Sequence, residues 1–283
     1  MFASPVVLDI LADFGVTPSG ARAVELQSLK RIITAGAPAT IPLQEKFRNL
    51  LDDKTDLFGI YGATETLPIA KVESREIFSL KEKTAQGAGV CLGKPIQGVV
   101  IRIIKIIDEP IEEWQESLTV DANVVGEITV QSAATTRGYI HRADADRLSK
   151  IKIGDDIIHR MGDVGYFDEE GRLWYCGRKS QRVETYDDIF FTEQIEGIFN
   201  THASVYRTAL VGVKKEPVLW VEPKPGKVNQ DTIKQELIEL AMHHPQASKI
   251  KTFLFIKKFP TDVRHNSKII REELTLLAEK RLR

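Results

Sequence analysis

The first 65 residues alternate between short apolar runs and a stretch with helical spacing of its apolar positions. Leu29–Thr34 and Leu57–Tyr61 are short apolar runs typical of strands, whereas Pro42–Leu51 places its apolar residues on one face of a helix. Phe2–Leu11 is apolar as well and resembles the interior of a fold. This order predicts an α/β organisation with polar residues just past the strand ends, where open α/β sheets tend to bind ligands.

The pattern changes between Gly98 and Gly165. Val99–Ile107 and Val124–Gln131 are rich in β-branched residues and predict antiparallel β-structure. Tyr166–Cys176 predicts a hairpin that turns at Glu169, Glu170 and Gly171.

A polar stretch follows Gly177 and predicts a domain boundary, with one domain over residues 1–177 and a small α+β domain over residues 178–283. Thr192 is the expected N-cap of the first helix in this second part. The patterns predict helices over 192–199, 230–242 and 269–283, and strands over 205–213, 217–222 and 252–257.

The composition is that of a globular protein, with 42% hydrophobic and 28% charged residues. Lys plus Arg (39) nearly equals Asp plus Glu (40), which argues against a nucleic-acid partner held by bulk charge. Cys91 and Cys176 are the only two cysteines, which excludes a disulfide scaffold and favours a reducing, cytoplasmic setting. No run approaches the roughly 20 apolar residues of a membrane span.

Two common motifs fail in this sequence. Gly87–Lys94 lacks the first glycine of a phosphate-binding loop, since that position is Ala88, and Pro95 stands where Ser or Thr is needed. The six histidines show no metal-ligand spacing, and the adjacent His243 and His244 project in different directions.

Four other segments stand out because they occur together and in order. The segments are Thr34–Pro38, Tyr61–Glu65, Met161–Asp163 with Tyr175–Arg178, and Arg264–Ile269. Taken singly, their residues have simpler interpretations: Gly36 as a turn glycine, Asp163 as a turn acid, Arg178 as a surface charge and Lys268 as a solvated charge at the start of a helix.

Together they resemble the adenylate-forming superfamily of acyl-CoA synthetases, luciferases and the adenylation domains of peptide synthetases. Tyr61–Glu65 reads YGATE and matches the family's Tyr-Gly-x-Thr-Glu segment, and Gly162–Arg178 matches its Gly-Asp, hairpin, Gly-Arg segment. Four longer segments, His159–Val183, Gly197–His202, Tyr206–Val213 and Val263–Ile269, resemble more closely the β-lactone synthetases of bacterial olefin biosynthesis. That resemblance implies ATP-dependent activation of a β-hydroxy fatty acid through an acyl-adenylate, followed by closure to a β-lactone with release of AMP and pyrophosphate.

The resemblance also implies the cofactors ATP or AMP and Mg²⁺, and a role for each matching residue. Gly36 and Ala37 lack bulk, so adenine can approach them, and Tyr61 offers an aromatic plane beside it. Thr64 can donate to the α-phosphate, and Glu65 is a hard oxygen ligand for Mg²⁺. The implied nucleotide-binding residues are Gly36, Ala37, Pro38, Tyr61, Gly62, Ala63, Thr64, Asp163 and Arg178.

Asp163 can accept hydrogen bonds from both ribose hydroxyls, and Arg178 can reach the ribose at the domain boundary. Lys268 matches the mobile lysine that the family's small C-terminal domain brings to the reacting phosphate and carboxylate oxygens. There it would stabilise charge that develops in the transition state. Lys268, Thr64 and Glu65 are therefore the expected catalytic residues.

The largest departure from the family pattern is a missing loop. The family has a Ser/Thr/Gly-rich phosphate loop well upstream of the segment that matches Gly36, and this sequence does not contain it. Ser132–Gly138 resembles it in composition only. We therefore expect the C-terminal half of an adenylate-forming enzyme: a remnant of the large domain, with a partial α/β sheet and a β-rich subdomain, followed by the small domain. The expected partners are a fatty-acid carboxylate substrate, an upstream-half polypeptide or other olefin-pathway enzymes.

Two alternatives remain open at this point: a fragment of a long-chain fatty-acyl-CoA ligase, and an inactive remnant that acts as an interaction module. The CoA-ligase alternative is weakened because Thr185–Asp188 carries two acids where CoA ligases form the pantetheine tunnel. Ser180 also replaces the usual hinge acid, and Ser267 replaces the glycine that precedes the lysine in CoA ligases.

Overall fold

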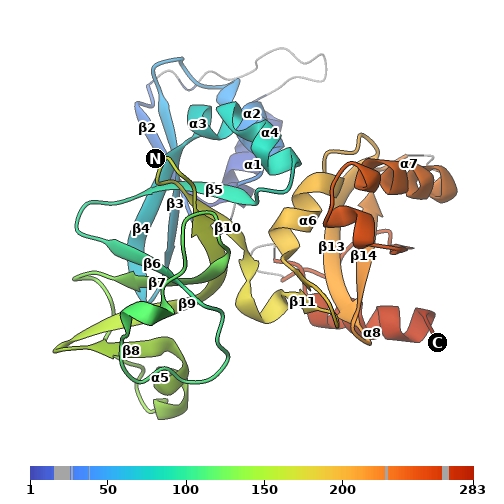
Figure 1. Ribbon diagram of the computed structural model, residues 1–283. Helices are drawn as coiled ribbons and strands as arrows, with labels where there is room; N and C mark the ends of the chain where they lie inside the picture. The colour runs from blue at the N-terminus through green and yellow to red at the C-terminus, as the bar shows by residue number, and fades with distance from the viewer. Residues whose placement is uncertain (16–25, 27, 38, 227–228, 263–267) are drawn as a thin grey trace. The chain divides into compact units, whose positions relative to one another are not determined.

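The computed structural model describes residues 1–15, 26, 28–37, 39–226, 229–262 and 268–283 (Figure 1). These form two compact units: Met1–Lys81 with Cys91–Trp174, and Glu82–Val90 with Tyr175–Arg283. We refer to them as the first and the second unit. The domain ranges expected from the sequence, 1–177 and 178–283, stay a prediction.

Most of the first unit is one ten-stranded sheet in the order β1-β2-β3-β4-β5-β10-β9-β7-β6, with β8 paired to β9. β1, β2 and β3 pair in parallel, and β4 follows β3 in antiparallel fashion. The strands are β1 (Phe2–Ala3), β2 (Arg31–Thr34), β3 (Asp56–Ala63), β4 (Thr66–Glu73), β5 (Val90–Pro95), β6 (Val100–Ile104), β7 (Gly126–Gln131), β8 (Lys150–Ile153), β9 (Asp156–Phe167) and β10 (Leu173–Arg178).

Short helices accompany this sheet: α1 (Pro5–Phe14), α2 (Ile41–Arg48), α3 (Ser74–Ser79), η1 (Glu116–Leu118) and α5 (Ala143–Ser149). Leu8 of α1 and Phe47 of α2 are fully buried against Ile32 of β2 and Leu57 of β3. The apolar positions that predicted a helix over Pro42–Leu51 thus face the parallel strands, as their helical spacing requires. The predicted α/β organisation is confirmed.

The hairpin predicted for Tyr166–Cys176 is present as β9 and β10. The Asp168 N–H donates to the Arg172 carbonyl at 3.0 Å, and Gly171 takes a φ of 72°, which glycine adopts without strain. The failed phosphate-loop motif lies on β5, where a Cβ on Gly93 would approach the Lys71 carbonyl to 2.0 Å. Gly93 is therefore required because the backbone of β5 lies too close to the Lys71 carbonyl for a side chain.

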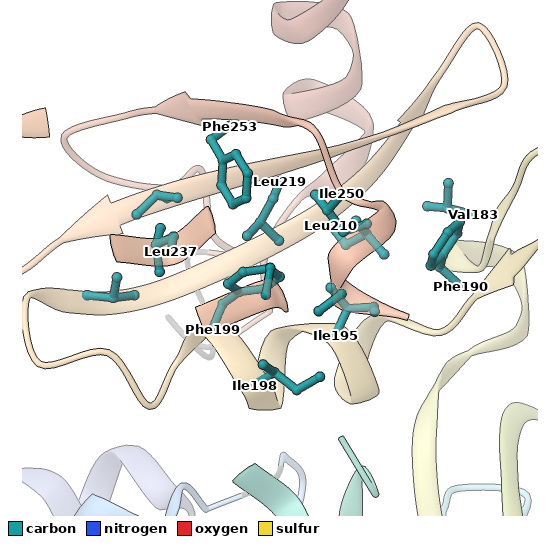
Figure 2. Packing of buried hydrophobic residues seen from close by; sticks show 14 of the residues in the cluster. Val183, Phe190, Ile195, Ile198, Phe199, Leu210, Leu219, Leu237, Ile250 and Phe253 are labelled. Atoms are coloured by element: carbon teal, nitrogen blue, oxygen red, sulfur yellow. The ribbon is translucent and has the colours of Figure 1, made fainter. Parts of the chain in front are cut away.

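The second unit has a three-stranded sheet, β13-β14-β15, covered by helices on both faces. Figure 2 shows one face, where Leu210 and Leu219 pack with Phe199, Leu237 and Phe253. The elements are α4 (Lys81–Ala85), η2 (Lys179–Gln181), β11 (Val183–Glu184), β12 (Ile189–Phe190), α6 (Thr192–Phe199), β13 (Val205–Val213), β14 (Glu216–Pro223), α7 (Gln230–Met242), η3 (Ala247–Lys249), β15 (Thr252–Phe255) and α8 (Arg271–Arg281).

α8 covers the other face of this sheet. Trp220 of β14 is fully buried there and donates its indole N–H to the Leu274 carbonyl at 3.1 Å. Successive residues of β14 alternate between the two faces, which explains why the strand is almost continuously apolar. The described helices include none that is both long enough and apolar enough to cross a membrane.

Three details of the predicted helices were wrong. The helix predicted over Pro42–Leu51 ends earlier, since α2 covers Ile41–Arg48. Thr192 is the first residue of α6 rather than its N-cap, and Phe191 occupies the N-cap position. α8 begins at Arg271 instead of Ile269, because Ile269 forms a β-bridge with Thr261 and the Ile270 N–H bonds to a carbonyl outside the helix. Local spacing could not anticipate that competing backbone pairing.

Each unit also contains a buried ion pair. Arg160 and Glu127, each with a side chain 1% exposed, meet at 2.6 Å in the first unit. Arg271 and Glu196 meet at 2.6 Å in the second. Removing one member of such a pair leaves an uncompensated buried charge, which destabilises a protein far more than loss of a surface pair.

Glu193, one turn before Glu196 on α6, should make the stability of the second unit depend on pH. Burial and the charge of Glu196 raise the pKa of Glu193 from 4.5 to about 7. The folded state therefore keeps a proton that the unfolded chain releases, so stability falls as pH rises through this range. We expect Glu193→Gln to raise the free energy of unfolding by about 1–3 kcal/mol at pH 8 and by little at pH 5.

Urea denaturation at both pH values measures this difference. Glu239→Gln is the control, since Glu239 lies exposed on α7 of the same unit. A stabilisation by Glu193→Gln of equal size at pH 5 and pH 8 would contradict the assignment to Glu193.

Candidate functional site

The register between β2 and β3 brings two of the four sequence segments to one edge of the sheet. Thr34, the last residue of β2, pairs with Gly59 of β3. β3 continues to Ala63, so Gly36 and Ala37 leave β2 at the same edge as the end of β3. Pro38 lies outside the described residues.

Gly36 has the properties expected beside a flat ligand. Its φ of 96° favours glycine, and a Cβ at this position would meet no atom of the described residues within 4 Å. Gly36 is exposed and Ala37 is half-buried. The space over this turn is therefore open, which satisfies the steric requirement of an adenine-binding surface.

Tyr61 and Asp163 lie together although 102 residues separate them in the sequence. The Tyr61 hydroxyl donates to Asp163 Oδ2 at 2.6 Å, and Asp163 is only 5% exposed. This hydrogen bond holds the carboxylate in one orientation and places it at the tip of the Tyr61 ring.

A bulge in β9 explains how Asp163 reaches this position. Thr129 of β7 pairs with Arg160 of β9, and Glu127 of β7 pairs with Val164 of β9. The two pairs are thus two residues apart on β7 but four residues apart on β9. β9 therefore contains two extra residues here, and bulges of this kind redirect side chains. Gly162 sits in the bulge with a φ of 66°, which accounts for the glycine in the Gly-Asp segment.

Thr64 and Glu65 form the turn that joins β3 to β4, where Ala63 pairs with Thr66. Gly62, just before this turn, is exposed, and a Cβ on it would come within 2.7 Å of Leu67 Cβ. Thr64 is exposed and Glu65 is half-buried. The turn thus presents a hydroxyl and a carboxylate side by side.

Sequence reasoning missed the residue that holds Glu65. The Tyr139 hydroxyl donates to Glu65 Oε1 at 2.7 Å, and the Thr136 N–H donates to the Glu65 carbonyl at 2.8 Å. Burial alone would raise the pKa of Glu65, but the Tyr139 hydrogen bond, a backbone hydrogen bond and the Lys150 charge act together against it, and the pKa is lowered. Burial and the Glu65 carboxylate raise the pKa of Tyr139 to about 12. Glu65 is thus held as an ionised carboxylate.

A buried cation supports this arrangement. Lys150 is 7% exposed, and its Nζ donates to the carbonyl and hydroxyl of Thr136 at 2.6 and 2.9 Å. The same Nζ lies 5.5 Å from the centroid of the Tyr139 ring. Burial and the Lys150 charge lower the pKa of His159 to about 4, which keeps this neighbour neutral at pH 7. The Ser132–Gly138 segment leads into Tyr139 and braces the Glu65 turn.

The remaining two candidates, Arg178 and Lys268, belong to the second unit. Arg178 is the last residue of β10 and is exposed. Lys268 is exposed, and its carbonyl accepts from the Asp262 N–H at 3.0 Å. The structure therefore gathers Gly36, Ala37, Tyr61, Gly62, Ala63, Thr64, Glu65 and Asp163 in the first unit, and Arg178 and Lys268 in the second.

The donor set limits the kind of metal site. Within the described residues, no three His, Cys, Asp or Glu side chains gather in a way that could hold a metal ion. Mg²⁺ is commonly held by one or two carboxylates together with substrate phosphates and water. A single ionised carboxylate, Glu65, beside the exposed Thr64 hydroxyl fits an ion that arrives with a nucleotide.

Known proteins resemble the chain in sequence. A family model described as AMP-binding enzyme matches residues 1–140. Over 98% of its length the chain is 42% identical to an olefin β-lactone synthetase of Xanthomonas campestris pv. campestris, of which it covers 50%. The chain thus spans about half the length of the curated relatives that it matches.

Solved structures share the fold. The amide bond synthetase McbA from Marinactinospora thermotolerans gives a TM-score of 0.75 at 22% identity, over 98% of this chain and 52% of that one. The o-succinylbenzoate CoA synthetase MenE from Bacillus subtilis, in complex with ATP and a magnesium ion, gives 0.67 at 21% identity, over 96% and 50%. The sequence thus resembles AMP-binding enzymes, since the family model matches residues 1–140 and the 42% identity extends over 98% of the chain. The solved structures, at 21–22% identity, show that the fold is shared.

Proposed function

We propose that this chain forms part of an enzyme that activates a β-hydroxy fatty acid as its acyl-adenylate and closes it to a β-lactone. The observation that carries this proposal is the identity to the olefin β-lactone synthetase across nearly the whole chain. The clustering of Tyr61, Asp163 and Glu65 in the first unit supports it, since these residue types suit a nucleotide with its metal ion.

We assign the adenosine to the edge of the sheet at the ends of β2 and β3. Adenine would lie over the open turn at Gly36 and beside the Tyr61 ring, with Ala37, Gly62 and Ala63 leaving room around it. Asp163, already fixed by the Tyr61 hydroxyl, would accept hydrogen bonds from the ribose hydroxyls. Bonds to an ionised acceptor are about twice as strong as neutral ones. Arg178 is a further ribose ligand in this proposal.

The turn between β3 and β4 would handle the phosphates. Thr64 would donate its hydroxyl to the α-phosphate, and Glu65 would hold Mg²⁺, which neutralises phosphate charge when it is bound. The Tyr139 hydroxyl already bonds one oxygen of Glu65, so the carboxylate meets the ion in a fixed orientation. Such outer partners commonly change metal affinity by 10–100-fold.

Lys268 would supply the positive charge for the transition state. In the first step, a carboxylate oxygen of the fatty acid attacks the α-phosphorus and pyrophosphate leaves. An exposed lysine that reaches these oxygens stabilises the charge that develops there.

The second step needs no external nucleophile. The β-hydroxyl oxygen of the substrate attacks the acyl carbonyl, the bond to AMP breaks, and the hydroxyl proton is released. Holding the two ends of one molecule together is the main catalytic contribution, because an intramolecular attack avoids the entropy of a second reactant. Asp187, exposed in the β11–β12 turn, favours this CoA-free chemistry, since its charge would repel the phosphates of CoA, whereas Asp188 is paired with Lys249.

We also propose that a further polypeptide segment completes the first unit. Val6, Val7, Ile10 and Phe14 of α1 are 36, 43, 50 and 78% exposed and form one apolar stripe, which we call the α1 apolar face. Contiguous exposed apolar surface of this kind marks an interface. The occupant we propose is the half of the family's fold that the aligned part of the relatives does not include, whether it is part of the same polypeptide or of another.

Catalysis by Lys268 can be tested by combining the chain with the unaligned part of the Xanthomonas synthetase. We expect AMP and β-lactone from ATP and a long-chain β-hydroxy acid without CoA, measured by chromatography and mass spectrometry. Lys268→Ala should lower AMP formation by about 10²–10³-fold with little change in nucleotide binding, since its interaction is made in the transition state.

Lys257→Ala is the matched control, because Lys257 is also an exposed lysine of the second unit. An equal loss in both variants would contradict the role of Lys268. A product that forms only when CoA is added would instead support a CoA ligase.

Tyr139→Phe tests the orientation of Glu65 in the same assay. Removing the hydroxyl frees one carboxylate oxygen, so we expect the Mg²⁺ concentration for half-maximal rate to rise about 10-fold. The rate at saturating Mg²⁺ should change only a few-fold. Tyr186→Phe serves as control, since Tyr186 is 86% exposed. An unchanged Mg²⁺ dependence in Tyr139→Phe would refute the orienting role.

The double substitution Ile10→Asp with Phe14→Asp tests the α1 apolar face. Two charges on this stripe should prevent the complementary half from binding, and should improve solubility of the chain alone because less apolar surface is exposed. Size-exclusion chromatography of the mixture measures binding. Leu276→Asp is the control, since Leu276 is an exposed apolar residue of α8. Unimpaired binding of the double variant would place the interface elsewhere.

A further inference from the structure

Lys268 lies in a small antiparallel ladder within the second unit. The Asp262 N–H donates to the Lys268 carbonyl at 3.0 Å, and the Ile270 N–H donates to the Pro260 carbonyl at 2.9 Å. These bonds fix the backbone of Lys268 while its side chain is exposed. The Lys268 ladder, as we call it, comprises residues 259–262 and 268–271.

A buried carboxylate holds the first end of this ladder. Glu222 of β14 is 6% exposed, and its Oε2 accepts the Phe259 N–H at 2.8 Å. The same oxygen accepts Arg207 Nε at 2.9 Å. Glu222 therefore connects the central strand of the sheet to the residue at which the ladder begins, and Arg207 balances its charge.

A second buried carboxylate holds the other end. Arg271 donates to both oxygens of Glu196 on α6, at 2.6 and 3.0 Å, and to the Leu210 carbonyl at 3.2 Å. Glu196 Oε1 also accepts the Leu210 N–H at 2.8 Å. This fork-shaped pairing fixes the orientation of both side chains as well as their distance. Arg271 is only three residues from Lys268.

Arg271 makes one further contact that bears on the movement of Lys268. Its Nε donates to Gln181 Oε1 at 3.2 Å, and Gln181 belongs to η2, directly after Arg178. The segment that enters the second unit and the ladder that carries Lys268 are therefore attached to the same guanidinium. A displacement of Gln181 would therefore alter a hydrogen bond of Arg271, which lies three residues from Lys268.

We propose that Glu196 and Glu222 are positioning residues for Lys268, acting through Arg271 and the Phe259 amide; this inference rests on the catalytic role proposed for Lys268. A lysine side chain on a fixed backbone has a defined reach, whereas a shift of about 1 Å at a reacting group can reduce a rate about 10²-fold. Both carboxylates are buried, so neither is positioned to contact a substrate directly. Their function is to keep the Cα of Lys268 in one place relative to the rest of the unit.

The first test uses the chain alone and needs no activity. In Glu196→Gln, hydrogen exchange at the Asp262 and Ile270 amides should become about 10-fold faster, since local opening requires less free energy once the charged fork is lost. Exchange at β14 amides, which do not bond to Glu196, should accelerate less than exchange in the ladder, which reports that the unit remains folded. Unchanged exchange in the ladder would overturn the proposal.

A second variant keeps the test decisive if Glu196→Gln does not fold. Glu196→Met with Arg271→Met replaces the buried pair by apolar side chains, an exchange that often preserves stability. It should loosen the ladder to the same extent. Glu236→Gln is the matched control, because Glu236 pairs with His202 at 2.9 Å in the same unit and outside the ladder. A folded double variant with a fully protected ladder would overturn the proposal.

The third test separates positioning from a merely structural role. In the complemented enzyme, Glu196→Gln should lower kcat for AMP formation at least about 10-fold, with KM for ATP within about twofold. In a Lys268→Ala background the same substitution should cause no further loss, because its effect acts through Lys268. An equal further loss there would overturn the proposal. If Lys268→Ala alone has no effect, the catalytic role proposed for Lys268 fails, and the exchange experiment still decides whether the carboxylates hold the ladder.

Discussion

β3 must complete its backbone hydrogen bonds with a parallel neighbour on one side and an antiparallel neighbour on the other, and the candidate site depends on this constraint. The parallel register with β2 places the turn at Gly36 beside the end of β3. The antiparallel register with β4 creates the tight turn that presents Thr64 and Glu65. Unpaired backbone groups inside a protein are costly, so neither register can slip without disturbing the whole sheet. The site is thus a consequence of strand pairing.

The side chains added to this framework are mostly held by polar contacts behind them. Asp163 is fixed by Tyr61, and Glu65 is fixed by Tyr139, which in turn lies against the buried Lys150. Buried polar groups are stable only when their partners are present, and satisfied networks are rigid. A nucleotide that met these groups would meet donors and acceptors already in place, which reduces the entropy lost on binding.

In the second unit, buried carboxylates are held by arginine side chains. Its two layers of apolar packing, shown in part in Figure 2, leave Glu196 and Glu222 buried beside the sheet. Arg271 and Arg207 compensate the charges of these carboxylates. The ladder that contains Lys268 is attached to Glu196 through Arg271 and to Glu222 through the Phe259 amide. Buried charges are weak contributors to stability, but they tolerate few alternative geometries. Because the buried ion pairs allow few alternative geometries, they keep the backbone of Lys268 in one position.

The sequence by itself determined the class of fold, most of the elements and the identity of the candidate residues. Strand and helix periodicities depend on local spacing, and Gly162 in a bulge and Gly171 in a turn both take a positive φ. What only the tertiary structure decided was which distant groups meet. Tyr139 as the partner of Glu65, the bulge that turns Asp163 toward Tyr61, and the start of α8 at Arg271 all result from pairing between segments far apart in the chain. Local sequence carries no record of such partners, because the same Tyr or Arg in another register would face a different neighbour.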